Sequence, residues 1–169
     1  MIMDIFSGSF RMTFERFDPT ADNGGASLYF LETAGFGHPD GPLIFRTVDG
    51  KMIRPASQLH DYDEGSVPQG FCQWEVSPNA WARAYACHDC MYCDHGWYEW
   101  DGNLGFWAFM PQVRHAVDVL LMRMAIATGC PVRQAEEMFE GVNLGGGEKW
   151  DGHPGPFPAL PFLESERAP

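Results

Sequence analysis

Residues 87–92 read Cys-His-Asp-Cys-Met-Tyr, and a His followed at once by Asp and four positions on by Tyr is the most informative feature of the chain. On a helix, His88 and Tyr92 would lie one turn apart on one face, with Asp89 about 100° around the axis. One helix would then present a base and an acidic metal ligand side by side. This arrangement suits hydrolysis in which a metal ion polarises a carbonyl and a histidine activates water.

Proline, glycine and apolar periodicity around this stretch predict three helices. The first begins at Ser77, a suitable N-cap followed by proline, and runs to about Cys93. Pro111 opens the second helix, which Gly129 ends. Pro131 opens the third, and a run of three glycines closes it.

Upstream, short β-branched and aromatic runs predict strands at 27–31 and 43–48, and residues 49–50 (Asp-Gly) predict a hairpin turn into a third strand at 51–53. The aromatic segment 97–109 predicts a second hairpin, whose rings form part of the core or, alternatively, surround a lipid or glycan pocket. The fold class is therefore α+β, a small N-terminal antiparallel sheet followed by three helices.

Composition limits the domain organisation and the partners. A chain of 169 residues allows one domain, assigned to 1–150 with its core at about 43–150, and the proline-rich end, 151–169, is predicted to be an extended tail. A net charge of −12 with 11 Lys and Arg argues against nucleic-acid binding and against anionic lipid surfaces. No segment approaches about 18 consecutive apolar residues, so no transmembrane segment is expected. The N-terminus lacks the basic start of a signal peptide, and five cysteines, an odd number, favour synthesis in a reducing cytoplasm.

Asp118 is the second chemical element of the sequence. It borders the apolar face of the second predicted helix, where a buried carboxylate must be paired or hydrogen-bonded. His88 and Tyr92 are its expected partners, so that Asp118 would hold one imidazole nitrogen and leave the other free as a base. The alternative is an ion pair with Arg114, one helical turn earlier.

Three cysteines, Cys87, Cys90 and Cys93, recur along one stripe of the first helix. Small buried thiols that pack helix against helix are the expected interpretation. The spacing with Cys130 also mimics an iron–sulfur run, and Cys87, Cys90 and His95 could meet one zinc ion. A continuous helix spreads these side chains along its length, so free thiols are predicted.

The His-Asp-x-x-Tyr pattern of residues 88–92, with a lone Asp118 on a following helix, resembles the helix pair of phospholipase A2. The resemblance implies that His88 activates water, that Asp118 and Tyr92 orient the histidine, and that Asp89 binds calcium. In that family a loop upstream of the helix adds backbone carbonyls to the ion.

The corresponding loop here is 66–70, which makes Gly70 a candidate calcium ligand through its carbonyl. Asp63, in the same loop, is a further candidate carboxylate ligand. The loop lacks the glycine-rich signature of the family. The resemblance nevertheless implies calcium as the one cofactor, with Asp89, Gly70 and Asp63 as its candidate ligands.

The order of motifs is also similar to an uncharacterised family of tailed phages and prophages, the domain of unknown function 1353. Its features correspond to a loop at 63–68, the helix motif at 88–92, the pair 117–118, where valine replaces the usual alanine, and a Gly…Trp ending at 146–150. The resemblance covers roughly residues 43–150.

The two resemblances together imply a phage-type virion protein of the tail or tail tip, with a phospholipase A2-like site that has degenerated. It would be made in the host cytoplasm and bind other virion proteins, and its extended tail favours such docking. The alternative is an active, calcium-assisted ester hydrolase with a His88–Asp118 dyad and a lipid substrate.

Overall fold

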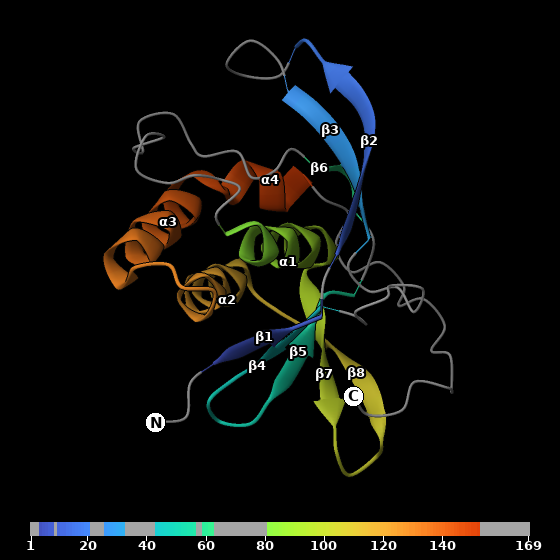
Figure 1. The fold of residues 1–169 in the computed structure, drawn as a ribbon, viewed down its shortest axis with the longest axis vertical. Helices are drawn as coiled ribbons and strands as arrows, with labels where there is room; N and C mark the ends of the chain where they lie inside the picture. The colour runs from blue at the N-terminus through green and yellow to red at the C-terminus, as the bar shows by residue number, and fades with distance from the viewer. Residues whose placement is uncertain are drawn as a thin grey trace.

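The computed structural model describes residues 4–8, 10–20, 26–32, 43–56, 59–62 and 81–152. The predicted α+β class is confirmed (Figure 1). The elements in chain order are β1 (Ile5–Ser7), β2 (Arg11–Asp18), β3 (Ala26–Glu32), β4 (Ile44–Arg46), β5 (Met52–Arg54), β6 (Leu59–Tyr62), α1 (Ala82–Asp94), β7 (Gly96–Asp101), β8 (Phe106–Pro111), α2 (Arg114–Ala127), α3 (Val132–Gly145) and α4 (Gly147–Gly152).

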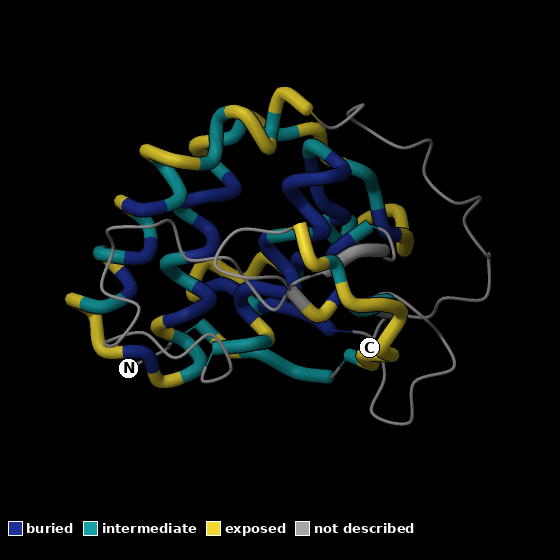
Figure 2. Tube along the Cα trace, turned by 90° about the horizontal axis from the view of Figure 1, so that it is seen from above, coloured by how far each residue is buried: buried dark blue, intermediate teal, exposed yellow. Residues whose placement is uncertain are grey.

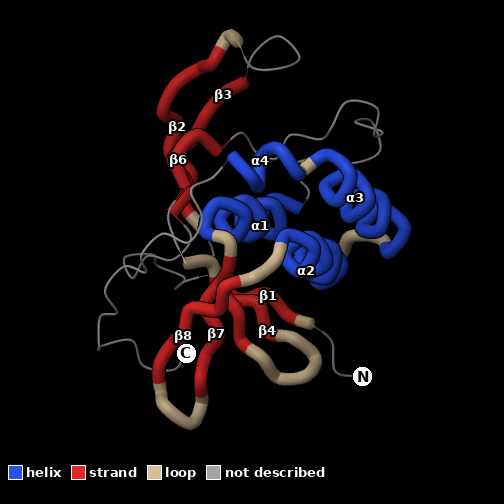
Figure 3. The backbone as a smooth tube through the Cα atoms, turned by 180° about the vertical axis from the view of Figure 1, so that it is seen from behind, coloured by secondary structure: helices blue, strands red, loops and turns tan. Residues whose placement is uncertain are grey.

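The larger sheet is antiparallel throughout, with strand order β1-β4-β5-β7-β8. The helices gather on one side of it, as the views from front and back both show (Figures 1 and 3). Its last two strands follow α1 in the chain, so the hairpin predicted in segment 97–109 completes the N-terminal sheet. Gly96 allows this pairing, because a Cβ there would lie 2.6 Å from the Met110 carbonyl oxygen.

The main core lies between the helices and this sheet, and buried positions line the inner faces of α1 and α2 (Figure 2). It contains aliphatic, aromatic and sulfur side chains, among them Phe45, Met91, Trp97, Leu121 and Met124. Trp100 and Phe109 of β7 and β8 pack in a smaller cluster around Ile44, Tyr98 and Trp107.

A second sheet, with order β2-β3-β6, carries a long hairpin that projects beyond the helices (Figure 1). Its base is held against α1, where Leu31 packs with Ala86 and Cys90. Toward the tip of the hairpin, Phe14 and Phe17 are largely exposed. One end of this sheet therefore belongs to the core and the other does not.

The helices differ from their predicted limits in two places. The second begins at Arg114, because Pro111 is the last residue of β8 and pairs with Gly96. A short fourth helix, α4, continues past residue 150 into the predicted tail, whose residues 153–169 lie outside the described part of the chain. The predicted start of the first helix at 77–80 lies outside it as well.

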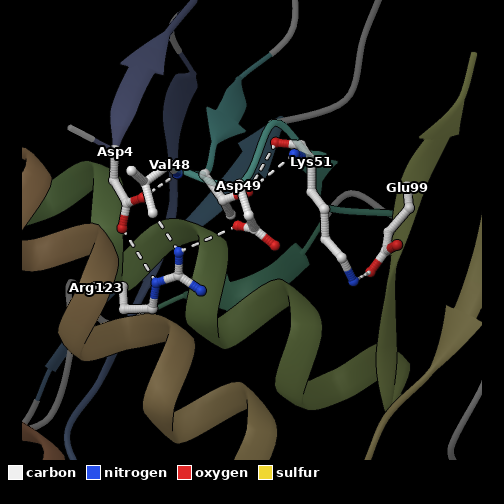
Figure 4. Close-up of polar contacts among 7 residues, drawn as sticks. Asp4, Val48, Asp49, Lys51, Glu99 and Arg123 are labelled. Atoms are coloured by element: carbon white, nitrogen blue, oxygen red, sulfur yellow. Dashed lines mark hydrogen bonds and ion pairs between the residues drawn. The ribbon is translucent and has the colours of Figure 1, made fainter. Parts of the chain in front are cut away.

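Arg123 of α2 fastens the first strand and the β4–β5 turn to the helices (Figure 4). Its guanidinium donates two hydrogen bonds of 3.1 Å to the Asp4 carboxylate and lies 3.8 Å from that of Asp49. Asp4 also accepts a hydrogen bond of 2.6 Å from the backbone of Val48.

None of the helices in the described ranges is both long and apolar enough to cross a membrane.

Candidate functional site

The packing of α1 against α2 brings together the residues that the sequence singled out. His88 Nε2 lies 3.1 Å from Asp118 Oδ1, so the predicted contact between the two side chains is confirmed. His88 Nδ1 lies 3.2 Å from Asp89 Oδ1. The imidazole is thus held between two carboxylates, one from each helix.

This geometry departs from the expected one at the second ring nitrogen. A histidine that acts as a base needs one nitrogen with an available lone pair. Here Nδ1, the nitrogen expected to be free, faces the Asp89 carboxylate. When both nitrogens face carboxylates, the favoured species is the imidazolium, which donates a hydrogen bond to each and has no lone pair to accept a proton.

The electrostatics support that protonated state. Burial alone would lower the pKa of His88, but the hydrogen bonds to Asp118 and Asp89, together with the charges of these two groups, raise it above its ordinary value of 6.5. The two carboxylates therefore keep the imidazole of His88 protonated, because an imidazolium buried without anionic partners would lose its proton.

Arg114 adds a second cation to the cluster. Its guanidinium lies 3.8 Å from Asp118 Oδ2, so the alternative ion pair coexists with the contact to His88. It also donates hydrogen bonds to the carbonyl oxygens of Val142 and Asn143, at 3.3 and 2.9 Å. These carbonyls stand at the C-terminal end of α3, where a cation is favourable. Two carboxylates and two cations therefore balance, in one network that joins three helices.

Tyr92 contributes its ring rather than a well-formed hydrogen bond. The ring lies over His88, with centroids 4.6 Å apart, and meets Trp150 of α4 edge-on at 5.0 Å. Its hydroxyl is buried and makes no hydrogen bond of good geometry with the described residues. Gly146 accommodates that hydroxyl, since a Cβ at position 146 would overlap it. The hydroxyl still interacts electrostatically with both Asp118 and Arg114, so the expected contact of Tyr92 with the carboxylate is present without a well-formed hydrogen bond.

The cluster is closed to solvent at its centre. His88 is 4% exposed and Asp118 0%. The Asp89 side chain, at 28%, is the more accessible carboxylate of the two. A water or a substrate in bulk solution can therefore meet Asp89, whereas the imidazole is covered.

The residues that can be placed do not form a calcium site. Calcium takes six to eight oxygen ligands as a rule, and Asp89, whose carboxylate contacts His88, is the single placed member of the predicted set. Gly70 and Asp63 lie outside the described residues. Within the ranges that the structure describes, no three His, Cys, Asp or Glu side chains are arranged to hold a metal ion.

The cysteines of α1 are buried free thiols, and Cys130 is a fourth. Burial raises the pKa of Cys87 well above its ordinary range and that of Cys93 to about 12. His95, the proposed partner in a zinc site, is stacked on Trp150 at 4.0 Å, and its Nε2 lies 3.0 Å from the Trp150 carbonyl oxygen. These contacts agree with a packing role for the thiols.

Two members of the cluster were not predicted from the sequence as parts of a site. Gly146 and Trp150 entered only through a family resemblance, and their contacts with Tyr92 arise because the α3–α4 junction folds back over α1. Arg114 was predicted only as a competing partner for Asp118. The four-residue spacing of that pair gave a signal for it, whereas nothing local in the sequence points to Gly146.

Comparison with known proteins finds no match: neither a family model, nor a curated protein, nor a solved structure is significantly similar to this chain.

Proposed function

We propose that this chain is a non-enzymatic structural protein of phage type, in which the His88 cluster fastens helices together instead of catalysing a reaction. One observation carries the proposal: a covered imidazole has a carboxylate against each of its nitrogens. A degenerate hydrolase site is expected to look like this, with the dyad retained and the catalytic nitrogen blocked.

The energetic argument favours a structural role. Removal of one partner of a buried ion pair is strongly destabilising, because it leaves a buried charge without compensation. Here Asp118, which is fully buried, has His88 on one oxygen and Arg114 near the other. Arg114 in turn is anchored on the end of α3. The network therefore fixes how α1, α2 and α3 pack, which is the property that a subunit of a larger assembly requires.

The proposed location is the virion, at the tail or tail tip, with other phage proteins as partners. This part of the proposal rests on the similarity between the order of motifs in this chain and that of the phage family. Its test is mass spectrometry of purified particles from a host that produces them. Recovery of this chain in stoichiometric amounts with tail proteins supports the location, and its recovery only from the host lysate contradicts it.

A second candidate function is a calcium-assisted ester hydrolase, and the exposure of Asp89 favours it. Rotation of this carboxylate toward a cation would free His88 Nδ1 while Asp118 kept its hold on Nε2. The freed nitrogen would then take a proton from water, and Asp118 would stabilise the imidazolium. Asp89 would be the one placed residue that contributes to holding the ion.

Ester hydrolysis on zwitterionic phospholipid micelles separates the two candidates. Wild type and His88→Ala are compared with and without millimolar calcium, and circular dichroism confirms that both are folded. The structural proposal expects no calcium-dependent release of fatty acid from either protein. Calcium-dependent hydrolysis by wild type that His88→Ala abolishes and Glu136→Ala, an exposed control on α3, retains would establish the hydrolase instead.

A further inference from the structure

Strand β2 combines length, exposure and apolar side chains at the edge of a sheet. Within the described part of the chain its one partner strand is β3. Met12, Phe14 and Phe17 are 37%, 57% and 55% exposed. An edge strand of this kind offers backbone donors and acceptors to another strand, and natural proteins either cover such edges or use them for assembly.

A β-bulge at Glu15 sorts the side chains of β2 onto two faces. Phe14 stands opposite Tyr29 and Arg16 opposite Leu28, so Glu15 is the extra residue of the ladder. Side chains that face one another across a ladder point to the same side. The extra residue therefore shifts Phe17 onto the face of Met12 and Phe14, where an unbroken alternation would place it on the opposite face.

With Glu15 left out of the count, β2 has seven ladder positions and Phe14 stands at the centre. The strand is then complementary to a second copy of itself in antiparallel orientation. On one face Phe14 meets Phe14 of the second copy, and Met12 meets Phe17 twice.

The opposite face of this pairing is charged. Arg11 stands across from Asp18 of the second copy at both ends of the ladder, and Thr13 stands across from Arg16. Opposite charges at facing positions stabilise a strand pair, whereas like charges destabilise it. The sequence of β2 contains two cations and two anions, so the overall charge of −12 does not repel at this contact.

We infer that this protein forms a two-fold symmetric dimer through antiparallel pairing of β2 with β2 of a second copy, which joins the two three-stranded sheets into one of six strands. The projection of the hairpin beyond the helices leaves room for this pairing (Figure 1). Because the two copies are antiparallel, their helical bodies lie at opposite ends of the joined sheet. The inference depends on the geometry of β2 and stands independently of the proposed function.

The test exploits the charge pairs. Arg11→Asp alone places two aspartates opposite one another at both ends of the ladder, and Asp18→Arg alone places two arginines opposite one another. Each single variant should raise the dimer dissociation constant about tenfold, measured by sedimentation velocity over a concentration series. In an equimolar mixture of the two variants, a heterodimer has an Asp–Arg pair at each end of the ladder. One end joins the two introduced side chains, and the other joins the two native ones. Such a heterodimer should therefore form with near wild-type affinity.

The mixture also controls for damage to the hairpin, since Asp18 accepts two hydrogen bonds from Thr20 within its own chain that mixing does not restore. Phe14→Glu should abolish the dimer, while Val132→Glu, an equally exposed apolar position on α3, should leave it intact. A wild type that is monomeric up to millimolar concentration overturns the inference. So does a dimer that tolerates Phe14→Glu, or one whose single variants are not rescued by mixing.

Discussion

His88 and Asp118 face one another across the α1–α2 interface, with Nε2 and Oδ1 3.1 Å apart and both side chains closed to solvent. The distance suits either a catalytic dyad or a structural ion pair. The surroundings distinguish these roles, because Asp89 holds the remaining nitrogen and Arg114 compensates the buried carboxylate.

Asp118→Ala should destabilise the fold by about 3–5 kcal/mol, since it leaves His88 and Arg114 without their buried partner. The measurement is the free energy of unfolding from urea titration at pH 7. The matched control is Glu137→Ala, which removes the surface ion pair with Arg133 and should cost about 0.5 kcal/mol or less. Equal effects of the two substitutions would contradict a structural role for the network.

Stability should fall as the pH rises above neutrality. The pKa of His88 is raised in the folded protein, so its contribution is complete below the ordinary value of 6.5 and is lost as pH rises through the folded-state pKa. The groups that face the imidazole are Asp89, Asp118 and the ring of Tyr92. Unfolding free energies measured between about pH 6 and 9 should decline for wild type, and the decline should be smaller in His88→Gln. If the unfolding free energies of the two proteins declined equally with pH, a group other than His88 would be the cause of the decline.

Tyr92→Phe should leave stability unchanged or slightly increased, because the hydroxyl that it removes is buried without a well-formed hydrogen bond to the described residues. The ring, which packs on His88 and Trp150, is kept. Thermal unfolding gives the comparison. A loss above about 1.5 kcal/mol would show that the hydroxyl is bonded in solution and would strengthen the resemblance to a catalytic tyrosine.

Gly146→Ala should destabilise the protein by about 1–3 kcal/mol through overpacking, since the added methyl would overlap the Tyr92 hydroxyl. Combination with Tyr92→Phe should recover part of the loss, because the nearest obstacle is then gone. The control is Gly147→Ala, where a Cβ has no neighbour within 4 Å. A double variant no more stable than Gly146→Ala would assign the cost to the α3 backbone instead.

The thiols of α1 should react slowly with alkylating reagents in the native protein. Burial raises the pKa of Cys93 to about 12 and that of Cys130 to about 11, so the reactive thiolate is scarce near neutral pH. Peptide mass spectrometry after timed alkylation would follow each cysteine, with urea-unfolded protein as the reference. Rapid modification of Cys87 or Cys90 under native conditions would contradict the packing role.

The α1–α2 contact was accessible to sequence reasoning because it depends on two local rules. One-turn spacing put His88 and Tyr92 on a common face, and an acidic residue beside an apolar face required a partner. Hairpins at Asp49-Gly50 and at 97–109 were likewise predicted from turn chemistry, and both are present.

The features that could not be predicted from the sequence depend on how the side chains and strands are placed in the folded protein. The rotation of Asp89 onto His88 is a choice between side-chain conformers that spacing does not determine. Strands β1, β2 and β6 were not predicted, because strands of three or four residues and a strand with charged and apolar residues out of strict alternation give a weak period-two signal. The bulge at Glu15 is the cause of that second irregularity.

Because of the same bulge, the insertion and the deletion of a single residue in β2 should have different effects on the exposed hairpin. Deletion of the single codon for Glu15 would let Arg16 follow Phe14 directly in a regular ladder, and every other side chain of β2 would keep its face. Insertion of one codon between Arg16 and Phe17 would instead turn Phe17 to the charged face. Length variation at this site should therefore be tolerated in one direction only.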